Sequence, residues 1–198
     1  MFRSRHDPAT TSRTRWRHRT AVLMTGLSTA VAVTLVAAPS ASAALPSITP
    51  GDYYRITGGS SGLAIDVESS SDADDARVVQ RPVDIESRSQ DWRALQQPSG
   101  AYEFRNAKSG KCLVVYLNDK AAGAHATQYT CDGTAGQLWT LRAGEIDPTA
   151  GLQSVLSGHY IDVPGNTLAP NTWLELQPGD AGGGPGLSQS FYMVRVDV

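Results

Sequence analysis

Apolar residues recur at every second position in short runs along residues 51–198. Leu63, Ile65 and Val67 alternate with other residues, and the same alternation appears at Leu174 and Leu176. A period of two is typical of a β-strand with one buried face. Clusters of Gly, Ser, Asp and Pro interrupt these runs at short intervals, at 58–60, 72–75, 98–100 and 179–186. No segment keeps a helical period over a useful length, so we predict that this part of the chain is all-β.

The strand pattern occurs three times along the chain. Three segments align without gaps and begin with evenly spaced glycines: Gly62–Val67, Gly110–Val115 and Gly158–Val163. Shortly before each glycine stands an apolar residue, and further on a Gln precedes an aromatic by two places: Ile56, Gln90 and Trp92; Phe104, Gln137 and Trp139; Leu152, Gln189 and Phe191. The three aromatics are expected to be equivalent core residues. The chain therefore divides into repeats of about 51–97, 98–145 and 146–198.

A single repeat of this size cannot bury its own apolar face. Three such units must therefore close around a common core. Three repeats of about four short strands predict a pseudo-threefold barrel with a cap, the β-trefoil. Closing the sheet also removes the exposed edges that an all-β protein has to protect.

The first 43 residues have the pattern of a secretory signal peptide. A start with six Arg and one acid precedes an apolar run, Ala21–Ala38, and the sequence Ala41-Ser-Ala43 follows it. Small residues at these places predict cleavage after Ala43, and secretion of a chain that begins with a short linker, 44–50. A retained membrane anchor is the alternative, but Gly, Ser and three Thr dilute the apolar run.

Removing the leader changes the charge of the protein. The remaining 155 residues carry 11 Lys and Arg against 18 Asp and Glu, a net charge of −7. A chain of this size excludes a large multidomain enzyme. Its acidity argues against a nucleic-acid partner, which needs net or clustered positive charge. We expect one secreted, mildly acidic domain that is monomeric and has no membrane contact after cleavage.

Both cysteines, Cys112 and Cys131, lie in the part expected to be exported. They are close in the sequence with strand-like residues on either side, so we expect them to pair in an oxidising compartment. Closing a loop of this size stabilises a fold by roughly 3 kcal/mol on the chain-entropy model. The alternative is two free buried thiols. A metal site is disfavoured because no His stands at ligand spacing.

The motifs and their spacing resemble the ricin B-chain-type β-trefoil lectin domain. In every repeat the glycine strand is followed, at a similar distance, by Gln-x-aromatic, and the pattern extends over residues 51–197. In that family each repeat can carry a shallow sugar site. The resemblance implies an Asp that accepts hydrogen bonds from sugar hydroxyls, an aromatic that stacks on the sugar, and polar residues at the Gln motif that orient it. The Cys112–Cys131 pair matches the family's disulfide within one repeat.

The first two repeats carry this family pattern only in part. In the first, Asp66 and Gln90 match, but an Arg takes the stacking position. In the second, Tyr129 falls on the stacking position and Gln137 matches, but Val114 replaces the Asp. Asp66 could instead accept N–H groups of the adjacent turn, and each Gln could be structural, tying neighbouring turns together.

The third repeat is the first candidate for a sugar site. Asp162 and Gln189 match the family pattern, and Glu175 and Gln177 lie on the middle strand. The stacking aromatic is missing from its usual position. Trp173 shares the face of Glu175 if strand alternation holds, and it could stack on a ligand in a displaced position.

The resemblance implies a secreted, non-catalytic module that binds galactose- or arabinoxylan-type glycans. Incomplete sets of sugar-binding residues leave an alternative open. In this alternative the trefoil has lost sugar binding and acts on a protein partner or as an inhibitor, with the glycine-rich insertion 179–186 as the contact loop.

Catalytic, metal and cofactor sites are not predicted. Gly58-Gly-Ser60-Ser-Gly62 fits the nucleophile elbow of a hydrolase, but a strand follows it where that enzyme fold needs a helix. Asp162 and Glu175 could be neighbours, yet neither lies in a run that indicates the deep burial of a glycosidase acid. The acids within 72–75 lack the glycine and distal Glu of an EF-hand calcium loop.

Overall fold

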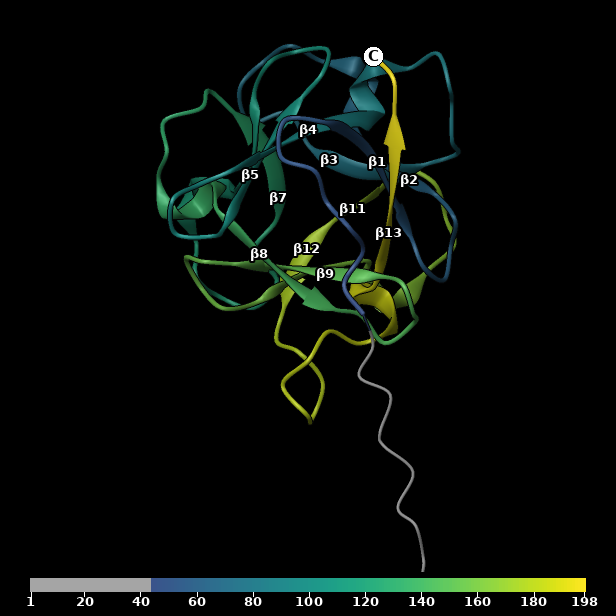
Figure 1. The fold of residues 1–198 in the computed structure, drawn as a ribbon, viewed down its shortest axis with the longest axis vertical. Coiled ribbons are helices and arrows are strands. Elements are labelled where there is room, and N and C mark those ends of the chain that lie inside the picture. Colours follow the sequence, from purple (N-terminus) through teal and green to yellow (C-terminus); the bar gives the residue numbers. More distant parts are fainter. Residues whose placement is uncertain (1–43) are drawn as a thin grey trace, which may run out of the picture. The chain divides into compact units, whose positions relative to one another are not determined.

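The computed structural model describes residues 44–198 (Figure 1). The signal peptide expected at 1–43 lies outside the described residues. The described chain consists of thirteen short strands and six single-turn 3-10 helices. Within 44–198, no helix is long and apolar enough to cross a bilayer.

Each repeat contributes the same succession of strands, most of which are labelled in Figure 1. The first repeat holds β1 (Tyr53–Gly58), β2 (Ala64–Val67), β3 (Val78–Arg81) and β4 (Asp91–Gln96). The second holds β5 (Tyr102–Asn106), β6 (Cys112–Val115), β7 (Ala126–Tyr129) and β8 (Trp139–Ala143). The third holds β9 (Ala150–Ser154), β10 (Tyr160–Asp162), β11 (Thr172–Trp173), β12 (Glu175–Gln177) and β13 (Phe191–Val196), its third strand being split in two.

Six of these strands close into a barrel. The antiparallel pairs run β1–β4, β4–β5, β5–β8, β8–β9, β9–β13 and back to β1. The other strands form three hairpins, β2–β3, β6–β7 and β10–β12. Pairing of β11 with β3 and two isolated bridges, Arg77–Thr127 and His125–Glu175, join the hairpins to one another. This is the β-trefoil, so the all-β, threefold prediction is confirmed.

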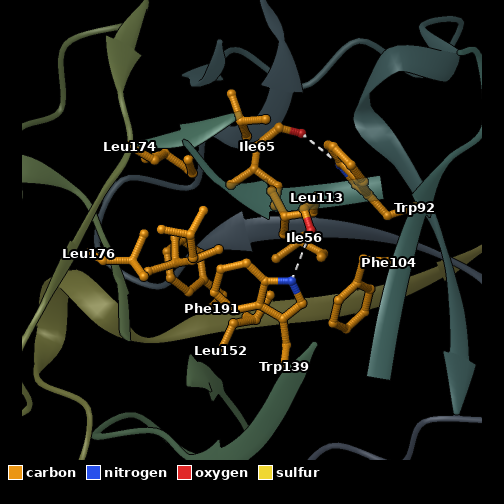
Figure 2. Close-up of a cluster of buried hydrophobic side chains, with 14 of the residues drawn as sticks. Ile56, Ile65, Trp92, Phe104, Leu113, Trp139, Leu152, Leu174, Leu176 and Phe191 are labelled. Carbon is orange, nitrogen blue, oxygen red and sulfur yellow. Dashed lines mark hydrogen bonds between the residues drawn. The ribbon is translucent and has the colours of Figure 1, made fainter. Parts of the chain in front are cut away.

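Equivalent residues of the three repeats meet in the core, as Figure 2 shows. Trp92, Trp139 and Phe191 are buried there, as the sequence predicts. A buried indole N–H needs an acceptor. Trp92 donates to the carbonyl of Ile65 at 3.3 Å, and Trp139 donates to the carbonyl of Leu113 at 3.1 Å. Each tryptophan thereby ties the last strand of its repeat to the second.

The glycine of each strand motif has a conformational cause. Gly62, Gly110 and Gly158 have φ angles of +66°, +70° and +78° in the turn before the second strand of each repeat. Only glycine adopts this left-handed region without steric cost, so the turn geometry selects it. The glycines that reveal the repeat therefore serve the fold.

A disulfide joins Cys112 of β6 to Cys131 just beyond β7. The predicted pairing is confirmed. The bond closes the hairpin of the second repeat beside Tyr129, which pairs with Cys112 across the two strands.

A buried ion pair also ties β1 to β4. Arg55 and Asp91 lie opposite each other in the strand register, with the guanidinium Nη2 2.6 Å from Asp91 Oδ1 and Nε 3.0 Å from it. The two side chains are 8% and 6% exposed. Burial raises the pKa of Asp91 and outweighs the adjacent Arg55 guanidinium, which lowers it, so the net effect is a raised pKa.

Candidate functional site

The third repeat holds an oriented carboxylate at the end of β10. Asp162 Oδ2 accepts hydrogen bonds from Gln189 Nε2 at 2.7 Å and from Ser188 Oγ at 2.9 Å. No described group donates to Oδ1, and this oxygen is not fully buried. Gln189 also donates to the carbonyl of Pro178 at 2.9 Å, which fixes its own amide. The carboxylate is thus held by one oxygen and has the other free to accept.

Neighbouring groups act on Asp162 in both directions. Burial raises the pKa of Asp162, the hydrogen bonds from Gln189 and Ser188 lower it, and the nearby Glu175 raises it. The net effect is a raised pKa. Glu175 lies directly opposite Asp162 in the β10–β12 register and accepts a hydrogen bond from Gln177 at 2.9 Å. The structure therefore brings together four of the residues named for this repeat.

Asp66 is the equivalent carboxylate of the first repeat, but it accepts a different set of hydrogen bonds. Asp66 Oδ1 accepts from Ser89 Oγ at 2.6 Å, and Oδ2 accepts from Gln90 Nε2 at 3.1 Å. Its donors are side chains and not the N–H groups of the adjacent turn. Gln90 also spans to a loop, donating to the Pro82 carbonyl and accepting from the Asp84 N–H. Both oxygens of Asp66 are already engaged, in contrast to Asp162.

A cavity of about 370 Å³ lies on the second repeat. Tyr129, 40% exposed at the end of β7, and the fully buried Gln137 both line it. Its other lining residues are Asp75, Val114, Val115, Leu117, Asn118, Asp132 and Thr134. The stacking aromatic and the Gln predicted for this repeat therefore border one open space, although Val114 stands where the other repeats have Asp.

Trp173 lies elsewhere, among the three hairpins. Its indole N–H donates to the Ala126 carbonyl at 2.8 Å. The His125 ring stacks on it at 3.7 Å between centroids and an interplanar angle of 9°, and the Arg77 guanidinium lies 4.5 Å from the ring centroid. Arg77, His125 and Trp173 are evenly spaced in the sequence, one in each repeat, and this spacing is the signal that could have revealed their contact. The indole is thus engaged by protein groups, and a displaced sugar contact through it stays a prediction.

The family of this chain is visible over most of the described residues. The family model described as "Ricin-type beta-trefoil lectin domain-like" matches residues 45–123 and 88–177. The chain belongs to this family. The resemblance stated from the motifs is therefore confirmed.

Solved structures place this ricin-type domain among known trefoils. A designed threefold-symmetric protein, ThreeFoil, is 28% identical with a TM-score of 0.68, and the match covers 73% of this chain and 99% of that one. An exo-β-1,3-galactanase from Clostridium thermocellum is 29% identical with a TM-score of 0.66, over 73% of this chain but only 30% of that one. A Macrolepiota procera ricin B-like lectin in complex with lactose is 19% identical with a TM-score of 0.64, over 76% of this chain and 100% of that one. A search of curated proteins found no match.

The two cysteines and two acids of the acidic turn in this ricin-type domain are paired with protein groups. Within 44–198 the one group of three possible ligands is Glu103 with Cys112 and Cys131, whose sulfurs are bonded to each other. In the acidic turn, Asp72 pairs with Lys108 at 2.8 Å and Asp74 with Lys111 at 2.7 Å. These ion pairs join the acidic turn of the first repeat to two lysines of the second.

Proposed function

We propose that this chain is a secreted, non-catalytic module that binds galactose- or arabinoxylan-type glycans through shallow sites on its repeats. The observation that carries the proposal is the Asp162 carboxylate, oriented by Gln189 and Ser188 through Oδ2, while no described group donates to Oδ1. Such a group can accept hydrogen bonds from sugar hydroxyls without rearrangement, which lowers the cost of binding. Family membership supports the same function.

The choice of sugar follows from two observations. A galactanase is among the similar structures at 29% identity, with a match that spans 30% of that enzyme, so galactose units come first. The net charge of −7 without the leader favours neutral over acidic glycans. Sites of this kind are open and individually weak, so several on one chain raise avidity for a polymer.

Retention on immobilised galactose and arabinoxylan tests the proposal. We expect retention that the free sugar elutes, and we expect Asp162→Ala to weaken it. Asp66→Ala is the matched control, because both oxygens of Asp66 are occupied by protein donors. No retention of the wild type on any glycan matrix would contradict the proposed function. Mass spectrometry of the exported protein, with an N-terminus at Ala44, checks the secretion route.

A second candidate is a protein-interaction or inhibitor module, and the insertion within 179–186 favours it. Asp180 Oδ1 accepts from the N–H groups of Gly182 at 2.9 Å and Gly184 at 3.2 Å, and Tyr160 donates to the Gly183 carbonyl at 3.2 Å. The loop therefore has a defined shape that a partner could recognise. Replacing Gly182–Gly184 with a shorter turn leaves glycan retention unchanged if the first proposal is right.

A further inference from the structure

We propose that the second repeat is a sugar site whose missing carboxylate is supplied by Asp75 of the first repeat. The proposal rests on the carbohydrate-binding function proposed above and adds a residue that lies outside the repeat's own motifs. Val114 stands at the position where the family has an Asp, so comparison of the motifs alone would exclude a sugar site in the second repeat. Two acidic residues line the cavity together with Tyr129: Asp132 of the same repeat and Asp75 of the first repeat.

The backbone of the first repeat positions Asp75. Its N–H donates to the Gln128 carbonyl of β7 at 2.8 Å, one residue before Tyr129. Its φ of +62° is shared by the equivalent positions of the other repeats, Gly123 at +85° and Asn171 at +62°. Asp, Asn and Gly are the residues that tolerate this region. Only the first repeat has a charged group here, and the turn carries it into the cavity of its neighbour.

Gln137 Nε2 donates one hydrogen bond where the equivalent Gln of each other repeat donates two. In the first and third repeats the Gln amide donates both to the Asp carboxylate and to a loop carbonyl. Gln137 Nε2 donates only to the Thr130 carbonyl, at 2.8 Å. Its side chain is fully buried and lines the cavity. A buried amide N–H without an acceptor is costly, and Val114 leaves Gln137 without the carboxylate that accepts from the equivalent Gln in the other repeats.

The cavity wall contains a strained apolar residue. Leu117 has a φ of +52° although it is not a glycine, and the equivalent residue of the third repeat is Gly165 at +61°. This Leu is also 75% exposed. Ser69, the equivalent residue of the first repeat, has a φ of +55°, so this turn conformation recurs in all three repeats, and a non-glycine residue in it costs about 1–2 kcal/mol. Leu117 and Tyr129 thus offer apolar surface on the same cavity.

This chemistry selects a neutral sugar. The Tyr129 ring can stack on the apolar face of a pyranose, and the carboxylates of Asp75 and Asp132 can accept from its hydroxyls. The same two carboxylates repel an acidic sugar. We therefore assign the second repeat to neutral galactosides and exclude uronic acids.

NMR titration of the chain carrying Asp162→Ala tests this assignment, because it removes the third-repeat site from the signal. Methyl β-galactoside is the probe and galacturonic acid is the acidic comparison. We expect amide shifts around Tyr129, Asn118 and Thr134 with the neutral sugar alone. Asp75→Gly should weaken this binding roughly tenfold, the loss expected for a hydrogen bond to a charged group. Gly is native at the equivalent position, so the turn is expected to keep its shape.

Two further variants separate binding from structure. Asp72→Asn makes a similar charge change in the same turn but does not border the cavity, and it should leave the affinity unchanged. Leu117→Gly should weaken the galactoside while leaving the urea midpoint unchanged or higher, since it relieves strain.

The outcomes distinguish the two proposals. If the amide signals of the wild-type chain shift around Asp162 but never around Tyr129, the second-repeat site is wrong and the proposed carbohydrate binding still holds. Equal affinity of Asp75→Gly and Asp72→Asn at Tyr129 overturns the role of Asp75. No shift at either repeat with any sugar overturns both.

Discussion

Removing one partner of the Arg55–Asp91 ion pair should destabilise the domain strongly. Asp91→Ala leaves a guanidinium inside the β1–β4 pair, where the two side chains are 8% and 6% exposed and joined by hydrogen bonds of 2.6 and 3.0 Å. An uncompensated buried charge of this kind costs about 3–5 kcal/mol. Asp91 also lies between Gln90 of the first repeat and the core residue Trp92 in the sequence, so the substitution should disturb both of these neighbours.

Replacing both partners should cost far less. Taking two charges out of water is costly, and replacing a buried ion pair by apolar residues of similar volume is often neutral or stabilising. The double variant Arg55→Met with Asp91→Leu is therefore expected to match the wild type within about 1 kcal/mol or to exceed it.

Urea unfolding followed by tryptophan fluorescence measures the free energy of unfolding for the wild type, Asp91→Ala and the double variant. A loss below about 1 kcal/mol for Asp91→Ala would refute the reasoning, because that is the cost of an exposed pair. A double variant as unstable as Asp91→Ala would refute the prediction that replacing both partners costs little.

Three other predictions concern the site and the core. Acidification should weaken galactoside binding at Asp162 at a pH above the ordinary titration range of Asp, because burial raises the pKa of this group and protonation removes the negative acceptor. In the same NMR titration, Asp162→Asn should bind the galactoside weakly at every pH. Replacing Cys112 and Cys131 by Ala should lower the free energy of unfolding by roughly 3 kcal/mol, and equal urea midpoints with and without reductant would contradict this. Trp139→Phe should lower the free energy of unfolding by about 1–3 kcal/mol, because the Leu113 carbonyl loses its buried hydrogen-bond donor. Calorimetry should show a lower Tm, and an unchanged Tm would contradict this hydrogen bond.

The fold could be predicted from the sequence because the residues that determine it recur in every repeat. Strand alternation and evenly spaced glycines are local signals, and the positive φ angles of Gly62, Gly110 and Gly158 explain why glycine stands there. One of the three equivalent core aromatics is Phe, and the spacing still identified Phe191 because burial needs only the ring.

The sequence could predict contacts of the site only between residues of the same repeat. The contact of Asp162 with Gln189 follows from the motif, because both stand at fixed positions of the same repeat. Trp173 was placed beside Glu175 by strand alternation, but the strand divides between them, and the indole packs on His125 instead. Asp75 approaches Tyr129 only through the pairing of two repeats. No spacing rule within one repeat predicts that these two residues line the same cavity.

Titration of the wild-type chain with methyl β-galactoside, followed residue by residue by NMR, tests the central claim most directly. The account predicts saturable shifts that converge on Asp162 and its neighbours Ser188 and Gln189, and that disappear in Asp162→Ala. Shifts that are absent at saturating sugar, or that persist unchanged in Asp162→Ala, would contradict it.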